Sequence, residues 1–255
     1  FTGNKFEFRM VGSRDSISEC NVVLNTIAAE AFKEACDRLE KADDFEMAVH
    51  DLIKEYAIDH QRIVFNGNGY APEWAEEAKR RGLPNLPSMV DAIPALTTDK
   101  AVKLFEEFHV FTKTELESRA EIQYEIYAKA VNIEAKTMID LATKQIIPAV
   151  VRYTTVLADS VNTVRAVGDI DVSVQLELLK KCSELLKTTN SAMKNLSDVV
   201  AKVSKIPEGR ERAVYCKDIV CKAMTELRTP VDELEMLVDK SMWPMPSYGD
   251  LIFEV

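Results

Sequence analysis

The sequence is poor in features that mark several classes of protein. Only 7% of its 255 residues are aromatic, and Asp and Glu outnumber Lys and Arg by 42 to 32. A net charge of −10 argues against a nucleic-acid binder, because phosphate contacts need clustered basic side chains. The basic stretch KRRG at 79–82 is typical of a solvated helix end.

Long apolar runs are also missing. No stretch approaches 18 uncharged apolar residues, so the sequence predicts no transmembrane helix and no membrane partner. No secretory signal peptide stands at the start. The chain begins with Phe1 rather than Met, and a strand pattern follows at residue 4 or 5, so we expect a fragment of a longer protein.

Cysteine and histidine are few and dispersed. The odd set of 5 cysteines favours reduced core thiols in a cytoplasmic protein. Cys216 and Cys221 lack a nearby His, so no zinc site is predicted. The histidines are expected to be structural or on the surface: His50, His60 and His109. No H-E-x-x-H motif, dinucleotide fingerprint or internal repeat is present.

Apolar residues recur at helical spacing through most of the chain. The pattern over 17–39, with Ile27 and Phe32, predicts a helix buried on a broad face, and a shorter helix follows from Phe45. The longest pattern runs from 112 to 145, where a core stripe is widened by several isoleucines. Those isoleucines are Ile122, Ile126 and Ile133.

Long helices with short connections predict a mainly α fold, an antiparallel bundle. Pro148 ends or kinks the longest helix, which then resumes to about 164. Further long helices are predicted over 174–204 and from 213 through Pro230. Residues 251–255 are expected to be strand-like.

The stretch RIVFNGNGYAP at 62–72 differs in character. Asn and Gly tolerate positive φ, so this is a tight, specific loop. It could position neighbouring elements or cradle a phosphate, although no G-x-x-x-x-G-K motif accompanies it. A short helix follows over 73–81, with Gly82 as its C-cap.

The first residues alternate charged and aromatic side chains. In a strand, Lys5, Glu7 and Arg9 point to one side, opposite Phe6 and Phe8. This face could be a solvated edge strand, or one wall of a site that binds a metal and an anion.

The opening KFEFRMVGS, followed by NVVLNTIAAE, resembles the end of the catalytic domain of glutamine synthetases, in the form of the type III class. Five further stretches resemble the C-terminal region of that class, in the right order. They are RIVFNGNGY, EWAEEAKRRGLPNLP, ESRAEIQYEIYAKAVNIEAKTM, IIPAVVRY and WPMPSYGDLIFEV. The resemblance covers nearly the whole chain and is least distinctive over 168–240.

The resemblance implies ATP-dependent ligation of ammonia to glutamate through γ-glutamyl phosphate, with Mg²⁺ or Mn²⁺. It implies that Glu7 is a metal ligand and that Arg9 is a catalytic and substrate-binding residue at the glutamate carboxylate or the phosphoryl group. Lys5, which replaces the commoner Arg, would meet substrate phosphate and the nucleotide. The family's other metal ligands lie upstream, so we expect the isolated chain to be inactive.

The resemblance also divides the chain. Residues 1–60 would end the catalytic domain, with its last strand, and 61–255 would be a helical C-terminal domain. The family assembles as stacked hexameric rings, so a homo-oligomer is expected. The alternative is that the bundle is an interaction or oligomerisation module without catalysis.

Overall fold

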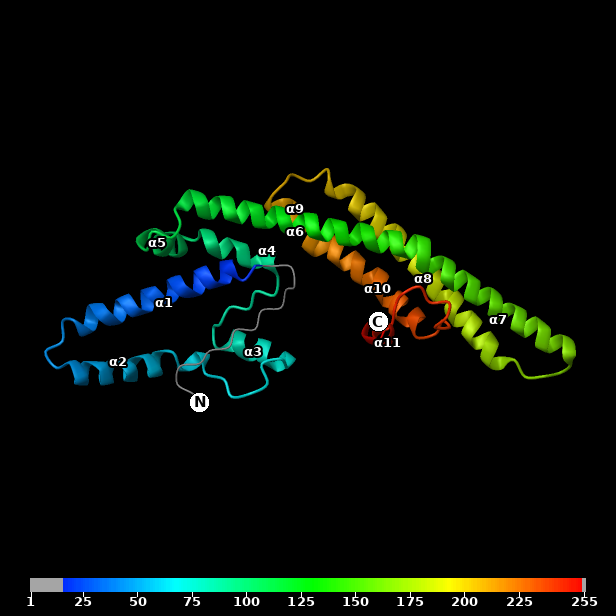
Figure 1. The fold of residues 1–255 in the computed structure, drawn as a ribbon, viewed down its shortest axis with the longest axis horizontal. Helices are drawn as coiled ribbons and strands as arrows, with labels where there is room; N and C mark the ends of the chain where they lie inside the picture. The colour runs from blue at the N-terminus through cyan, green and yellow to red at the C-terminus, as the bar shows by residue number, and fades with distance from the viewer. Residues whose placement is uncertain (1–15, 254–255) are drawn as a thin grey trace. The chain divides into compact units, whose positions relative to one another are not determined.

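The computed structural model describes residues 16–253. Within that range the chain is helical and contains no strand (Figure 1), which confirms the mainly α prediction. The predicted N-terminal strand lies outside the described residues. The helices form two compact units, which are described separately below.

The first unit comprises the residues up to Pro87 together with Ala95–Glu117. Helices α1 and α2 form a hairpin, and α5 packs against α1. The helices of this unit are α1 (Ser18–Leu39), α2 (Phe45–Asp59), α3 (Pro72–Arg80) and α5 (Asp99–Glu107), with the start of α6.

The caps of this unit follow from its sequence. The Asp44 side chain accepts a hydrogen bond from the Met47 N–H, and Thr98 caps α5 in the same way through the Ala101 N–H. Such side chains satisfy amides that have no partner within the helix.

The hairpin is thinly packed. On α1 only Thr26 is buried, and on α2 only Leu52. The prediction that α1 is buried on a broad face is therefore wrong for this chain, because Ile27 is 48% and Phe32 is 72% exposed. The apolar pattern is present, but the elements between residues 16 and 253 cover it only in part and leave Ile27 and Phe32 exposed.

The second unit is the predicted bundle. It comprises Ser88–Pro94 and the chain from Ser118 onwards. Its long helix α8 packs against both α7 and α10, as Figure 1 shows. The helices are α4 (Met89–Ala92), α6 (Lys113–Leu141), α7 (Ile147–Val167), α8 (Ser173–Val203), α9 (Arg210–Tyr215), α10 (Cys221–Glu235) and α11 (Tyr248–Phe253).

Three helices build the main core of this unit. Small residues of α6, such as Ala135, face Leu196 of α8 and Leu227 of α10, and all three side chains are almost fully buried. Side chains of the three helices thus share one core, and the backbones of α8 and α10 approach each other most closely. The isoleucines predicted to widen the α6 stripe lie outside this core and are exposed: Ile122, Ile126 and Ile133.

Two π-helical turns interrupt the long helices. At Ala142–Ile146 the Ile147 N–H bonds to the Ala142 carbonyl, five residues back. Pro148 follows at once, and it has no N–H to donate and crowds the preceding turn. The helix resumes as α7, as predicted. The second π turn, Cys216–Val220, joins α9 to α10, and Pro230 is accommodated inside α10.

The strand-like prediction for 251–255 is wrong for residues 251–253, which belong to helix α11. The Asp250 carboxylate accepts hydrogen bonds from the Ser247 N–H and hydroxyl, each at 2.7 Å, and the Asp250 N–H donates back to the Ser247 hydroxyl. This reciprocal cap starts a helical turn and outweighs the strand preference of the short apolar run. Residues 254–255 lie outside the described range.

Candidate functional site

The predicted catalytic and metal-binding side chains, Lys5, Glu7 and Arg9, lie outside the described residues. Between residues 16 and 253, no three His, Cys, Asp or Glu side chains gather in a way that could hold a metal ion. Within that range the most elaborate polar arrangement surrounds the Asn-Gly loop and helix α3.

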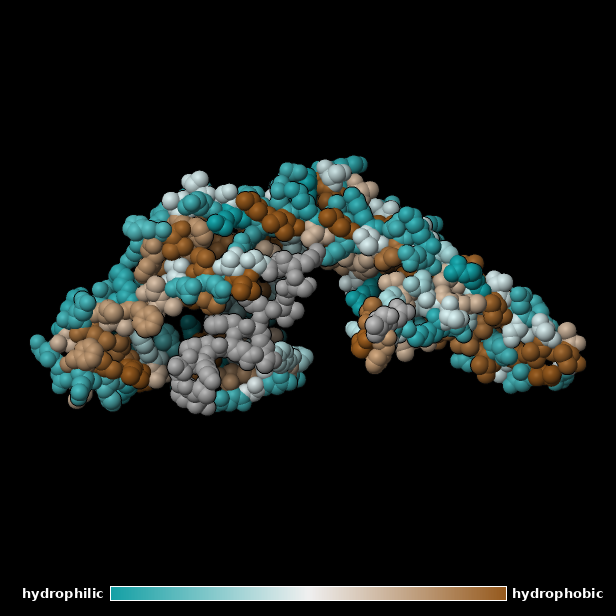
Figure 2. Space-filling model, in the orientation of Figure 1, coloured by the Kyte–Doolittle hydropathy of each residue, from teal (hydrophilic) through white to brown (hydrophobic). Residues whose placement is uncertain are grey.

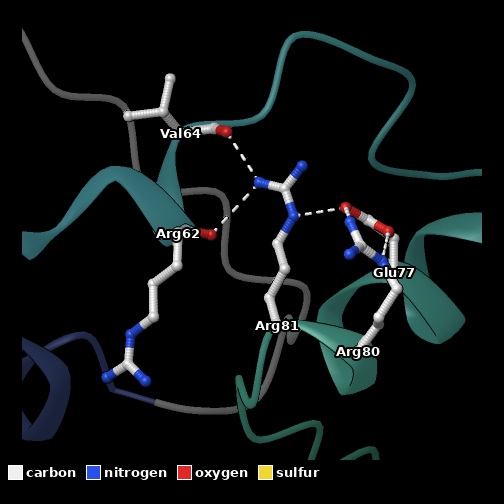
Figure 3. Close-up of polar contacts among 5 residues, drawn as sticks. All are labelled: Arg62, Val64, Glu77, Arg80 and Arg81. Carbon is white, nitrogen blue, oxygen red and sulfur yellow. Dashed lines mark hydrogen bonds and ion pairs between the residues drawn. The ribbon is translucent and has the colours of Figure 1, made fainter.

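Arg81 organises this arrangement from the end of α3 (Figure 3). Its guanidinium donates to the backbone carbonyls of Val64, at 2.8 Å, and Arg62, at 3.2 Å. It also donates to the carboxylate of Glu77, at 2.5 Å. A planar guanidinium can serve several acceptors at once, so one side chain joins the loop to the helix.

A Schellman motif fixes the position of Arg81. Gly82 adopts a φ of +70°, which glycine tolerates without a steric penalty. The Gly82 N–H bonds to the Lys79 carbonyl at 3.0 Å, and the Leu83 N–H bonds to the Ala78 carbonyl at 2.8 Å. The predicted closure of the helix by Gly82 is therefore confirmed, and Arg81 is the C-cap residue that directly follows α3.

Aromatic packing reinforces the contacts of Arg81 with Glu77, Arg62 and Val64, which we call the Arg81 clamp. The rings of Phe65 and Trp74 lie 4.1 Å apart between centroids. The Arg81 guanidinium lies 5.6 Å from the Phe65 centroid and 5.9 Å from that of Trp74, within range of cation–π attraction. The loop and α3 are thus joined by both polar and apolar contacts.

Gly67 and Asn68 fix the backbone of the loop. A Cβ added to Gly67 would lie 2.4 Å from the Phe65 ring, so only glycine fits without a shift of that ring. The Asn68 side chain accepts from the Tyr70 N–H at 3.0 Å and fixes the next turn. Tyr70 is 81% exposed, so the loop presents an aromatic side chain on an anchored backbone.

The charges of the clamp are strongly coupled. Hydrogen bonds from Arg80 and then Arg81 lower the pKa of Glu77 to about 2. Glu77 is therefore ionised through the physiological range, and it offsets the two cations that converge on it. The stretch interpreted as a solvated helix end contains Arg81, whose role the sequence pattern did not reveal. The spacing of Glu77 and Arg81, one helical turn apart, was the available signal.

The thiols of the bundle have structural surroundings. Cys182 and Cys216 are buried, and burial raises the pKa of Cys216 to about 11. The Cys216 thiol donates to the Ala128 carbonyl at 3.9 Å, and the Tyr127 hydroxyl lies 3.8 Å from the Cys221 sulfur. A thiol kept protonated in this way is a poor nucleophile. The prediction of core thiols is confirmed for Cys182 and Cys216 and is wrong for Cys36, which is exposed because its face of α1 is uncovered.

None of the helices between residues 16 and 253 combines the length and the hydropathy that a bilayer-spanning segment requires.

Comparison with known proteins finds similarity to glutamine synthetases. The family described as glutamine synthetase C-terminal domain matches residues 48–165. Over 99% of its length the chain is 36% identical to "Type-3 glutamine synthetase" of Dictyostelium discoideum. It is 33% identical to "Glutamine synthetase" of Butyrivibrio fibrisolvens over 100% of its length, and 29% identical to "Glutamine synthetase" of Bacteroides fragilis over 99%.

The chain spans 36% of the length of the first of these relatives, 37% of the second and 36% of the third. The similarity therefore extends from one end of the chain to the other and covers a little over a third of each relative. These matches place the chain in the glutamine synthetase family, as a C-terminal portion of the type III class.

Proposed function

We propose that this chain is the C-terminal part of an enzyme that joins ammonia to glutamate at the expense of ATP, through a γ-glutamyl phosphate. The observation that carries the proposal is the similarity over 99% of the chain to a type 3 glutamine synthetase. The chain alone is inactive, because the remaining two-thirds of the enzyme would supply most of the site.

The residues that take part are Lys5, Glu7 and Arg9. A carboxylate on a strand suits a hard divalent cation, so Glu7 is the candidate ligand for Mg²⁺ or Mn²⁺. A bound divalent cation would neutralise phosphate charge. Arg9 binds the glutamate carboxylate or the phosphoryl oxygens with its planar fork, and Lys5 meets nucleotide phosphate as a point charge.

The helices have a supporting role in this proposal. Residues 1–60 complete the catalytic domain and 61–255 form the helical C-terminal domain. We place the enzyme in the cytoplasm, as a homo-oligomer of stacked hexameric rings. The Arg81 clamp holds the Asn-Gly loop of the helical domain in one conformation, which suits a loop that contacts another part of such an assembly.

A second candidate is that the bundle is an interaction module without catalysis. The observation in its favour is the row of exposed isoleucines on α6, of which Ile133 is 65% exposed. Such side chains on one face of a helix are typical of a surface that meets a partner. The two candidates differ in whether the first residues are needed for chemistry.

The test compares glutamine synthesis by the full-length parent enzyme with that of its Glu7→Ala and Arg9→Ala variants. We expect both variants to lose most of the activity. The control variant Glu40→Ala, which changes the exposed C-cap residue of α1, should retain it. Unchanged rates for Glu7→Ala and Arg9→Ala, with the fold intact, would favour the interaction module. ATP-dependent glutamine formation by the isolated chain would contradict the claim that it is inactive.

A further inference from the structure

A pocket lies within the second unit, where α6 meets the end of α8 and the start of α9. Its volume is about 270 Å³. The α6 side of the lining includes Lys129, Asn132 and Lys136, which are three and then four residues apart and so share one face of the helix. Figure 2 shows hydrophilic as well as hydrophobic residues on the surface of this helix.

The connection between α8 and α9 forms the opposite wall, and Arg212 fixes its conformation. The Arg212 guanidinium donates twice to the Ile206 carbonyl, at 2.6 and 3.0 Å, and once to the Glu208 carboxylate, at 3.0 Å. Gly209 is buried and has a φ of +82°, which lets the chain turn at this point. The guanidinium lies at the carboxyl end of α8, where it offsets the negative end of the helix dipole.

Most charged groups of the lining are paired with one another. Lys129 pairs with Glu125 at 2.9 Å, and Arg212 pairs with Glu208 at 3.0 Å. Lys136 differs from them, because it has no ion-pair partner among residues 16–253. The pocket therefore has one cation whose charge is not offset by a carboxylate.

Two neutral groups of the lining are also without a partner. The amide of Asn132, which is half-buried, and the hydroxyl of Ser204, the C-cap residue of α8, form no hydrogen bond within the described part of the chain. Asn132 lies one helical turn before Lys136. One cation and two groups that can donate hydrogen bonds together complement a carboxylate.

The floor of the pocket is apolar. It is formed by Ala128, Val200 and Val203, which are at most 8% exposed and belong to the main core of the bundle. A ligand whose charged end meets Lys136 would lay an aliphatic part on this floor. Pockets for drug-sized ligands have volumes of about 300–1,000 Å³, so this smaller pocket suits a ligand of only a few carbons.

We propose that this pocket binds a small carboxylate with a short aliphatic chain. The Lys136 ammonium pairs with the carboxylate, Asn132 and Ser204 donate to its oxygens, and the chain packs on the apolar floor. Inorganic phosphate offers the same kind of charge without an apolar part, so it binds more weakly. The site is made by residues of the second unit and does not depend on the proposed function.

The test is amide hydrogen exchange in the full-length parent, followed peptide by peptide by mass spectrometry. Sodium pentanoate is the probe, and sodium chloride at equal ionic strength is the baseline. We expect pentanoate to slow exchange over residues 200–212 at least about threefold, because the wall can open only after the ligand has left. Peptides that respond elsewhere in the parent do not enter this readout.

A matched pair of variants tests the cation. Lys136→Met removes the ammonium and keeps an unbranched side chain, and Lys187→Met changes an exposed lysine of α8 outside the lining. Because Lys136 is exposed, the fold should tolerate its replacement. We expect Lys136→Met to need at least about fivefold more pentanoate for the same protection, and Lys187→Met to need no more than the wild type.

Three results would overturn the proposal. Unchanged exchange over residues 200–212 with pentanoate would refute the site. An equal need for pentanoate in the wild type and Lys136→Met would refute the recognition of an anion. Equal protection by sodium phosphate would refute the aliphatic carboxylate as the ligand class. A parent without glutamine synthetase activity would refute the proposed function and leave this proposal standing.

Discussion

Thr189 lies in the middle of α8, fully buried, and its hydroxyl has no hydrogen-bond partner among the described residues. Other hydroxyls of the same helix bond one turn back: Thr188 to the Glu184 carbonyl at 3.1 Å, and Ser183 to the Leu179 carbonyl at 2.7 Å. We therefore predict that Thr189→Val stabilises the protein.

The magnitude follows from the desolvation of the hydroxyl. A buried polar group without a partner costs about 1–3 kcal/mol, and valine replaces the hydroxyl with a methyl group of similar size. Both residues are β-branched, so the helix preference of position 189 changes little. We expect a gain of about 1–2 kcal/mol, which corresponds to a rise in melting temperature of about 2–4 °C for each kcal/mol.

The assay is urea unfolding followed by circular dichroism, with Thr188→Val as the matched control. Thr188 is exposed and its hydroxyl is bonded, so its replacement should change the free energy of unfolding by less than about 0.5 kcal/mol. If Thr189→Val lowers the stability by about 1 kcal/mol or more, the hydroxyl has a partner and the reasoning fails.

Three further predictions test the clamp, a turn and a thiol. Because Arg80 and Arg81 lower the pKa of Glu77 to about 2, its ionised form stabilises the clamp above pH 4.5, and this contribution is lost as the pH falls to about 2. The loss should appear as a change in Trp74 fluorescence between pH 4.5 and about 2. Glu77→Gln should abolish this change, and a variant whose fluorescence depends on pH as that of the wild type does would contradict the prediction. Gly209→Ala should cost about 1–3 kcal/mol in urea unfolding, since φ is +82° and the new Cβ would lie 2.6 Å from the Glu121 carboxylate. Gly168→Ala, with open space around it, should cost far less, and equal losses would refute this argument. Burial raises the pKa of Cys216 to about 11, so at pH 8 its alkylation should be slow until urea is added, and rapid labelling of the native protein would contradict its burial.

Much of the bundle is predictable because its helices bury their apolar faces within the chain. Leu116, Ala120 and Tyr124 follow steps of four and are buried as the pattern predicts. The pattern fails at Ile122 and Ile133, because helical spacing shows that a face is apolar but not whether a partner covers it. The same reason explains α1, whose apolar faces are conspicuous in the sequence and exposed in the structure.

Local polar chemistry was harder to foresee. The π turn before Pro148 depends on the exact hydrogen-bond register, which hydrophobic periodicity does not specify. The helix α11 depends on the reciprocal bonds of Ser247 and Asp250, which a short apolar run conceals. Arg81 reaches carbonyls 17 and 19 residues away, and no spacing rule anticipates such contacts.

The central claim is that the first residues of the chain belong to a metal-dependent active site. Its most direct test is a titration of Mn²⁺ into the full-length parent and into its Glu7→Gln variant, followed by electron paramagnetic resonance. We expect Glu7→Gln to weaken one Mn²⁺ site per subunit by about 10–100-fold while the fold stays intact. Identical Mn²⁺ binding by both proteins would contradict it.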